Sequence, residues 1–356
     1  MTKINIGVVF GGKSPEHEVS KASAINIFAS LDQDKYNIIP IFISKDGDWF
    51  LYDGSLNKLP DNIEKYCASV TLSKQGMLRI VGEKVKILTI DVAFSVIHGA
   101  TGEDGYIQGL FEMAELPYVG CGVLASALCM DKCYTRVIAA SLQIPITPSM
   151  IYSLYDLSNM DEVTKEIRAT IGYPCFIKPS SSGSSLGTSK AKNKKEVTKA
   201  IQEALKYSTK VIVEKYVKAR ELECAVLGTG EEIEISTVGE IVTPEEFYTY
   251  TAKYHNPASK TVIPADISED VIQKIREYSY TLFKGVGAFG LARIDFFLED
   301  KTGKVIFNEI NTMPGFTDIS MYPKLIEHMG YSQQALLDKL IELAIYRSKK
   351  NLANTV

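Results

Sequence analysis

The chain has 356 residues, of which 46% are hydrophobic and 23% are charged, and its formal net charge at pH 7 is −4. This composition is typical of a folded protein with two or three domains, and it gives no reason to expect nucleic acid or an anionic membrane as a partner. No apolar run reaches the roughly 20 residues of a membrane span, and the first residues look like a strand, not a signal peptide. Six scattered cysteines without a CxxC pair indicate reduced thiols in a cytoplasmic protein.

The first predicted strand, residues 4–10, runs into the glycine turn 11–15 and then into a helix that ends near Ser30. A strand, a glycine turn and a helix N-terminus together form a place for an anion. The spacing is not GxGxxG, so a dinucleotide-binding oxidoreductase is only a weak alternative. Glu16 and Glu18 lie in the first helical turn, where they either serve a site or simply complement the helix dipole.

A second glycine-rich loop, residues 98–105, follows strand material at 85–97 and precedes a helix over 107–115. Open α/β sheets bind ligands at the carboxyl ends of their strands. His98 begins this loop and two acidic residues, Glu103 and Asp104, follow it closely, so His98 is a candidate site residue.

In the middle of the chain, residues 123–142 read as one helix that carries Lys132, and residues 173–179 read as a strand that holds Lys178. The Ser/Gly run at 180–187 follows directly. It is either a linker or a short hairpin whose amides and hydroxyls fold over phosphates, with lysines supplying positive charge.

Three further segments suit a nucleotide site. Residues 210–217 read as a strand in which Glu214 and its neighbours can contact an adenine edge and ribose, although an ordinary charged strand end has the same pattern. Residues 220–227 read as another strand. Residues 247–264 are rich in tyrosine without a clear period, which favours an ordered lid loop over a site.

The most informative stretch, residues 291–316, reads as two strands joined by a turn at 301–303. If that turn is a three-residue loop with glycine in the left-handed position, Asp300 pairs with Lys304. Asp295 then faces Glu309, and Arg293 faces Asn311, with facing Cβ atoms roughly 5 Å apart.

The alternate positions of this hairpin are apolar and can pack on a core: Ile294, Phe296, Leu298, Ile306 and Ile310. On the polar face, two carboxylates and an amide favour a hard cation, Mg²⁺ above all. A surface salt-bridge ladder is the alternative, and a register slip of one residue would separate the carboxylates. Turn residues 311–315 follow directly and can direct backbone N–H groups toward a ligand.

Taken in order, these segments resemble the D-alanine–D-alanine ligases of the ATP-grasp superfamily. The motifs that carry the resemblance span nearly the whole chain: GGKSPEHEVS, HGATGEDGYIQGLFE, ALCMDK, FIKPSSSGSSLG, VEKYVKARELECAVLG, FYTYTAKY, LARIDFF and FNEINTMPGF. The resemblance implies an α/β ATP-grasp fold of three domains. These are a Rossmann-like substrate domain at 1–122, a central domain with the phosphate-binding loop at 123–213, and a C-terminal domain with the metal site and lid at 214–356.

The resemblance also implies the reaction. The γ-phosphoryl group of ATP moves to the carboxylate of one D-alanine, and the amine of a second D-alanine attacks the acyl phosphate, giving D-alanyl-D-alanine for peptidoglycan precursors. Two Mg²⁺ ions, with Mn²⁺ as a second candidate, would be held by Asp295, Glu309 and Asn311. The residues implied for ATP binding are Lys132, Lys178, Ser184, Ser185, Glu214, Lys215, Val217, Glu221 and Asn308.

For the amino-acid substrates, the resemblance implies that Glu16, helped by His98, pairs with the first ammonium group. Arg293 and the Gly315 amide would stabilise the oxyanion. Lys253 and Ser320 would hold the second carboxylate, beside Met321. Glu16, Ser184 and Tyr254 would form a hydrogen-bonded trio, and the enzyme would be a homodimer.

Some residues depart from the family pattern or leave the second substrate open. Ala219 stands where relatives usually have glycine, three serines at 180–182 precede Gly183, and Asp318 adds a negative charge near the second-substrate pocket. A D-alanine–D-serine ligase is therefore an alternative, which Met321 disfavours because an arginine is expected there. A nucleotide sensor without catalysis is a further alternative, but it would need a broken metal site.

Overall fold

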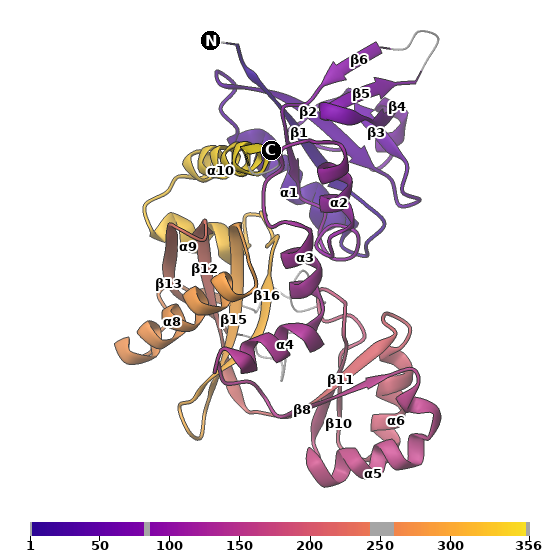
Figure 1. Ribbon diagram of the computed structural model, residues 1–356, viewed down its shortest axis with the longest axis vertical. Coiled ribbons are helices and arrows are strands. Elements are labelled where there is room, and N and C mark those ends of the chain that lie inside the picture. Colours follow the sequence, from indigo (N-terminus) through magenta and orange to yellow (C-terminus); the bar gives the residue numbers. More distant parts are fainter. Residues whose placement is uncertain (1, 82–85, 243–259, 354–356) are drawn as a thin grey trace.

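The computed structural model describes residues 2–81, 86–242 and 260–353, and these form three β-sheets with helices packed on them. The sheets follow one another along the chain, although in space the last one lies between the other two (Figure 1). The mixed α/β architecture agrees with the expected fold class.

The N-terminal sheet contains seven described strands in the order β6-β5-β4-β3-β2-β1-β7. Their bounds are β1 Ile4–Gly11, β2 Tyr36–Ile43, β3 Trp49–Tyr52, β4 Cys67–Leu72, β5 Met77–Ile80, β6 Lys86–Thr89 and β7 Val92–Ser95. Parallel pairing joins β2, β1 and β7, whereas the other pairs are antiparallel. The sheet is therefore mixed, and the Rossmann-like character of this region stays a prediction.

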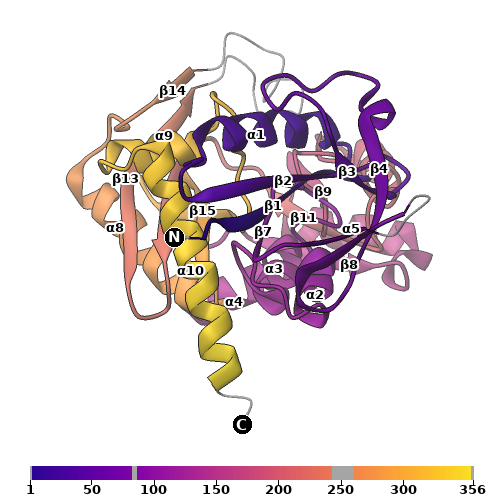
Figure 2. The ribbon, with the colours of Figure 1, turned by 90° about the horizontal axis from the view of Figure 1, so that it is seen from above.

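Alternating side chains of β1 explain why helices cover both faces of this sheet. Ile6, Val8 and Phe10 pack with α1 (His17–Ser30), whereas Val9 packs with α2 (Tyr106–Met113). Successive strand side chains point to opposite faces, so an all-apolar strand needs cover on both. Figure 2 shows α1 lying along the sheet. The N-terminus of α1 and the loop after β7 thereby meet at the same edge.

The central sheet is antiparallel, with the order β10-β9-β11-β8. Its elements are β8 Ser149–Ser153, α5 Met160–Thr170, β9 Cys175–Pro179, β10 Ser189–Ala191, α6 Lys194–Ala204 and β11 Lys210–Lys215. Apolar residues of α5 and α6, including Ile167, Val197 and Ile201, pack on Ile177 and Val211. The Ser/Gly run connects β9 to β10, so it is a hairpin loop and not a linker between domains.

The third sheet has the order β14-β13-β12-β15-β16 and is antiparallel. Its strands are β12 Ala219–Gly228, β13 Ile233–Val242, β14 Lys260–Val262, β15 Gly290–Glu299 and β16 Val305–Asn311. The helices that follow in this part are α8 Glu269–Gly285, α9 Met321–His328 and α10 Gln333–Ala353. Helix α8 covers one face, and α9 and α10 share a second core with α1 and the N-terminal sheet. This shared core holds the two sheets together.

The predicted helix over 123–142 is wrong as a single helix. The chain forms α3 (Val123–Met130) and α4 (Lys132–Ser141), because Asp131 adopts an extended conformation with φ −85° and ψ 100°. Its carboxylate accepts hydrogen bonds from the backbone N–H groups of Cys133 and Tyr134, which caps α4. Lys132 thus becomes the first residue of a helix that points toward the Ser/Gly loop.

Other boundaries also differ from the predictions. The strand material at 85–97 is interrupted, since β6 ends at Thr89 and β7 begins at Val92. The last part of the expected lid, residues 260–262, is strand β14 paired with β13. Residues 247–259 of that lid, including Lys253 and Tyr254, lie outside the described part of the chain.

The hairpin β15–β16 confirms the predicted register at its polar end and corrects it near the turn. Arg293 faces Asn311 and Asp295 faces Glu309, but Phe296 faces Phe307 because a β-bulge intervenes. The Glu299 backbone N–H donates to the Lys304 carbonyl oxygen at 3.0 Å, so the loop has four residues instead of three and Asp300 does not pair with Lys304. As a consequence Phe307, not Ile306, packs against Phe296 in the core.

Candidate active site

Two cavities meet where the three sheets converge. The larger has a volume of about 500 Å³ and the smaller about 390 Å³. Lys132, Ser182, Glu223 and Glu309 line both cavities, so these four residues form a shared wall. A group transferred from a ligand in one cavity to a ligand in the other would cross at this wall.

The smaller cavity lies between the central and third sheets and contains most of the residues predicted to bind ATP. Its lining includes Lys132, Lys178, Ser185, Glu214, Lys215, Val217, Glu221 and Asn308. Ser184 differs from this group, because its side chain lines the larger cavity instead. The aromatic rings of Phe176, Tyr216 and Phe297 line the smaller cavity as well and offer an apolar surface for a flat ring.

A buried ion-pair network stands behind this cavity. Lys178 Nζ lies 2.8 Å from a Glu214 carboxylate oxygen, and Arg136 pairs with the other oxygen. Arg136 also donates to the Asn308 carbonyl at 2.7 Å. Although burial alone would raise the pKa of Glu214, the charges of Arg136 and Lys178 hold that pKa below its ordinary value. The network fixes Lys178 before any ligand binds.

Arg136 did not appear among the residues predicted from the sequence. It stands four residues after Lys132 on α4, and this spacing places both side chains on one helix face. That spacing was the available signal. A continuous helix over 123–142 hides this signal, because it has no N-terminus at Asp131 from which Lys132 and Arg136 can be counted.

Lys132 is held at the shared wall by three contacts. Its backbone N–H donates to the Ser180 carbonyl at 2.8 Å, and its Nζ donates to the Ser182 carbonyl at 2.7 Å. The same Nζ lies 3.4 Å from Glu309. The ammonium group therefore links the Ser/Gly loop to strand β16, where a transferred phosphoryl group would need positive charge.

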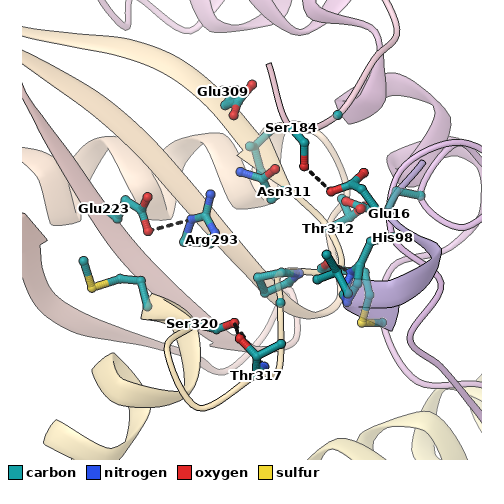
Figure 3. A pocket seen from close by; sticks show the side chains of 18 of the residues that line it. Glu16, His98, Ser184, Glu223, Arg293, Glu309, Asn311, Thr312, Thr317 and Ser320 are labelled. Carbon is teal, nitrogen blue, oxygen red and sulfur yellow. Dashed lines mark hydrogen bonds and ion pairs between the residues drawn. The ribbon is translucent and has the colours of Figure 1, made fainter. Parts of the chain in front are cut away.

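The Ser/Gly loop has an unusual backbone at its tip. Ser184 and Ser185 adopt positive φ values of 49° and 59°, which residues other than glycine rarely do. Such conformations occur at functional sites, where the surrounding structure holds them in place. Here the Ser184 hydroxyl donates a hydrogen bond to the Glu16 carboxylate, so the loop tip is tied to the N-terminal domain (Figure 3).

Glu16 is buried between two glycines that allow close approach. A Cβ atom at Gly99 would lie 2.4 Å from a Glu16 carboxylate oxygen, and one at Gly183 would lie 2.6 Å from the same oxygen. Neither glycine was singled out in the sequence. At both positions a side chain would displace the Glu16 carboxylate. Glu16 and Ser184 are thus brought together as the family resemblance implied, while Tyr254 lies outside the described residues.

His98 is buried and is held in one tautomer. Its Nδ1 lies 3.2 Å from the Met313 carbonyl, which can only accept, so Nδ1 carries the proton. Nε2 then accepts from the Ser23 hydroxyl at 2.9 Å, and the Ser23 oxygen accepts from the Phe316 N–H. Burial lowers the pKa of His98, which keeps the ring neutral. His98 joins the N-terminal domain to the loop after β16.

Arg293 is the centre of the polar face of the third sheet. Its Nε and Nη2 donate to the two oxygens of Asp295, both at 2.8 Å, and Nε also lies 2.9 Å from Glu223. Asn311 donates to Asp295 at 3.1 Å. Although burial works against the charge, Asp295 and Glu223 raise the pKa of Arg293 well above its ordinary value, so the guanidinium stays charged. Glu223 was not among the predicted site residues.

The loop after β16 and the N-terminus of α9 close the larger cavity. Gly315 lines it, and a Cβ atom there would lie 2.7 Å from the Ser320 hydroxyl oxygen. Ser320 is the N-cap of α9 and shares a hydrogen bond with the Thr317 hydroxyl at 2.8 Å (Figure 3). Met321 lines the same cavity and contacts Gly239. A helix N-terminus at this place suits a carboxylate.

Two acidic residues near this cavity, Glu103 and Asp318, differ in their surroundings. Glu103 lines it and accepts from the Gly99 N–H at 2.8 Å, and burial, followed by the charge of Glu16, raises its pKa to about 8. Asp318 accepts from Asn26 Nδ2 at 2.8 Å. Its carboxylate is therefore tied to α1, which weakens the idea that Asp318 acts on the second-substrate pocket.

The predicted metal ligands lie at the junction of the cavities. Asp295 lines the smaller cavity, Asn311 lines the larger, and Glu309 lines both. Within the described residues no group of three histidine, cysteine, aspartate or glutamate side chains is placed to hold a metal ion, so the predicted site relies on the Asn311 amide beside its two carboxylates. Two facing carboxylates and an amide oxygen fit a hard cation such as Mg²⁺.

Family models match nearly the whole chain. The model described as the D-ala D-ala ligase N-terminus matches residues 5–121, and the one described as the D-ala D-ala ligase C-terminus matches residues 138–342. A D-alanine–D-alanine ligase of Acetivibrio thermocellus is 44% identical over 98% of both chains. One of Caldicellulosiruptor bescii is 42% identical over 98% of this chain and 97% of its own. The chain belongs to the D-alanine–D-alanine ligase family.

Solved structures agree with this assignment. A D-alanine–D-alanine ligase from Coxiella burnetii has a TM-score of 0.87 at 37% identity, covering 99% of this chain and 98% of its own. The VanG D-Ala:D-Ser ligase from Enterococcus faecalis has a TM-score of 0.86 at 38% identity, covering 96% and 100%. Among the helices of the described residues, none combines the length and apolar character that crossing a membrane requires.

Proposed function

We propose that this protein joins two D-alanine molecules to D-alanyl-D-alanine, converting ATP to ADP and phosphate. The observation that carries the proposal is the shared wall of Lys132, Ser182, Glu223 and Glu309 between two cavities. A nucleotide in the smaller cavity and an amino acid in the larger would place phosphate and carboxylate on either side of it. The relatives named D-alanine–D-alanine ligase support this reaction over an oxidoreductase.

In the smaller cavity, the proposal assigns ATP to the residues predicted for it. Glu221 and the segment from Lys215 to Val217 would contact ribose and adenine. Lys178, fixed by Glu214, and Lys132, fixed by the Ser/Gly loop, would bind the phosphates. Because both ammonium groups are already held in place, ATP binding loses less side-chain entropy in ordering them.

The proposal includes divalent metal ions, Mg²⁺ or Mn²⁺, held by Asp295, Glu309 and Asn311. When bound, such ions would neutralise phosphate charge and polarise the transferred phosphoryl group. Because the Asn311 amide donates to Asp295 in this structure, its oxygen can face away from that carboxylate and serve as a ligand.

In the larger cavity, Glu16 would pair with the ammonium group of the first D-alanine, and the neutral His98 would help to shape this end. A carboxylate oxygen of that D-alanine attacks the γ-phosphorus, and ADP leaves. The amine of the second D-alanine then attacks the acyl carbon, loses a proton, and expels phosphate. Arg293 and the Gly315 amide would stabilise the oxyanion of the tetrahedral intermediate.

The second D-alanine would bind at the N-terminus of α9. Ser320 and the helix dipole suit its carboxylate, and Lys253, outside the described residues, is proposed to add a positive charge. Tyr254 is likewise proposed to join Glu16 and Ser184 in closing the site, because water would hydrolyse an acyl phosphate.

A D-alanine–D-serine ligase is a second candidate function. The similarity to VanG, a D-Ala:D-Ser ligase, favours keeping it. Met321 argues for D-alanine, since its apolar side chain lines the larger cavity beside the α9 N-terminus and offers a serine hydroxyl only a weak thioether acceptor.

The test of the proposed function is a product analysis. Purified protein is incubated with ATP, Mg²⁺ and D-alanine, with or without D-serine, and phosphate release and product mass are measured. One phosphate per D-alanyl-D-alanine is expected. A mixed D-alanyl-D-serine product as the main species would support the second candidate, and no D-alanine-dependent phosphate release would refute both.

We also propose that the enzyme is a homodimer in the cytoplasm. Adjacent helices α2 and α3 expose large apolar side chains, among them Tyr106, Met113 and Leu124. An exposed apolar surface of this kind is typical of a protein interface. Light scattering should give twice the mass of the chain, and Leu124→Asp should give a monomer; a monomeric parent protein would refute the dimer.

A further inference from the structure

The third sheet carries a row of three carboxylates across neighbouring strands. Glu223 of β12 faces Asp295 of β15, and Asp295 faces Glu309 of β16. Facing side chains on one side of a sheet lie within about 5.5 Å at their Cβ atoms, and like charges at that separation repel. The row therefore needs positive charge to be stable.

Arg293 supplies that charge between the first two carboxylates. Its Nε lies 2.9 Å from Glu223 (Figure 3). Its Nε and Nη2 also donate to the two oxygens of Asp295. Glu223 and Asp295 each expose 7% of their surface, so these contacts are weakly screened. Two carboxylates on different strands hold the plane of the guanidinium more firmly than one could.

The third nitrogen, Nη1, is placed differently. It makes no hydrogen bond or ion pair with any residue in the described ranges 2–81, 86–242 and 260–353, and Arg293 lines the larger cavity. The carboxylates thus occupy Nε and Nη2 and leave Nη1 for a ligand. Its direction is set by how the other two nitrogens are held.

The two carboxylate partners of Arg293 are not equivalent. Asp295 is a candidate metal ligand, and a carboxylate that binds a cation shares its negative charge with that cation. Glu223 is not a predicted metal ligand. A bound ion at the predicted metal site would therefore leave the contact of Glu223 with Arg293 in place.

We propose that Glu223 is a positioning residue of the ligation reaction, which fixes the Arg293 guanidinium so that Nη1 faces the reacting oxyanion in the larger cavity. This inference rests on the proposed function. It assigns a role to Glu223, which lines both cavities and for which the sequence predicted no role. A displacement of the guanidinium by about 1 Å would cost on the order of 10²-fold in rate.

Glu223 could instead have a purely structural role, in which it only compensates a buried charge. In that case the loss of its charge lowers the melting temperature, and it changes the rate by the same factor whether residue 293 is arginine or lysine. If Glu223 acts through Arg293, the two residues are coupled, and a double-mutant cycle separates the two roles.

The experiment compares Glu223→Gln, Arg293→Lys and the double variant by steady-state phosphate release with ATP, Mg²⁺ and D-alanine. Glu223→Gln keeps the side-chain shape and removes its charge, and we expect kcat to fall about 10- to 100-fold with KM for ATP within about twofold of the parent value. Arg293→Lys, which keeps a charge, should lose about 10²- to 10³-fold, as for loss of an oxyanion donor. The double variant should match Arg293→Lys within about twofold.

Glu234→Gln is the matched control. Glu234 is another carboxylate of the third sheet, which accepts from the Tyr331 hydroxyl at 2.8 Å away from both cavities, and its replacement should leave kcat unchanged. Parent-like kcat in Glu223→Gln, or multiplied losses in the double variant, would overturn the inference while the parent enzyme still makes D-alanyl-D-alanine. A parent protein that makes none would instead refute the proposed function.

Discussion

The two cavities of this protein are assembled in different ways. The smaller one is built from residues 132–309, and its charged side chains already pair with one another, as Lys178, Glu214 and Arg136 do. The larger one combines Glu16, His98, Ser184 and the segment from Arg293 to Met321, which are far apart in the chain. Nucleotide binding should therefore tolerate changes in the contacts of the N-terminal sheet with the rest of the chain, whereas D-alanine binding should depend on those contacts.

The largest effect on the rate is expected at the shared wall, because a change there should impair the use of both ATP and D-alanine. Glu309→Gln takes a charged ligand from the candidate metal site and a partner from Lys132. We expect ATP turnover to fall about 10³-fold, equivalent to about 4 kcal/mol of transition-state stabilisation. The melting temperature without ligands should change little, and parent-like phosphate release would contradict the assignment of Glu309 as a metal ligand.

Arg136→Met should affect the smaller cavity alone. It leaves the buried Glu214 with one cationic partner, and breaking a buried pair in this way costs about 3–5 kcal/mol of stability. KM for ATP should rise, while KM for D-alanine stays near the parent value. Combining it with Glu214→Gln should restore part of the lost melting temperature. If Arg136→Met has the parent's stability and KM for ATP, the network does not position Lys178.

Ser184→Ala should affect the larger cavity alone. It removes the hydrogen bond to Glu16, and a bond to a charged group contributes about 1.5–3 kcal/mol. We expect kcat/KM for D-alanine to fall at least about tenfold, with KM for ATP unchanged. Ser189→Ala, on β10 beyond the loop, is the control. Equal changes in both KM values would mean that the loop serves both substrates.

The last prediction concerns the pH dependence of stability and Glu103. Its pKa in the folded protein is about 8, against an ordinary value of 4.5. Between these two values the folded state holds a proton that the unfolded state has lost, so this group's contribution to stability decreases as pH rises from 4.5 to 8. Between pH 5 and pH 8, the melting temperature of Glu103→Gln should fall less than that of the parent protein. Parallel melting curves for the two proteins would show that burial does not raise this pKa.

The hairpin shows how far the sequence alone leads. The pairs Arg293–Asn311 and Asp295–Glu309 were predicted correctly by counting from a three-residue turn. The turn has four residues, which shifts the register by one position, and the β-bulge near Asn308 adds one residue to β16. The two shifts cancel, so the predicted pairs at the polar end are correct. Alternation of apolar residues indicates that a strand exists, but it cannot locate a bulge.

Contacts between distant segments were harder to predict. The apolar pattern of residues 123–142 indicated a helix, but tertiary contacts of Lys132 with the Ser/Gly loop favour a break at Asp131. The contact of Glu16 with Ser184 joins residues 168 positions apart and was inferred from the family resemblance, not from spacing. Glu223 and Arg136 were missed because their partners lie on other strands and helices.

The central claim, that phosphoryl transfer to D-alanine crosses the shared wall, is tested most directly with isotopes. D-alanine labelled with ¹⁸O in its carboxylate is turned over with unlabelled ATP, and the released phosphate is analysed by mass. If the carboxylate attacks the γ-phosphorus, each phosphate carries one ¹⁸O atom from D-alanine. Phosphate without ¹⁸O would mean that water attacks ATP directly, which would contradict an acyl phosphate between the two cavities.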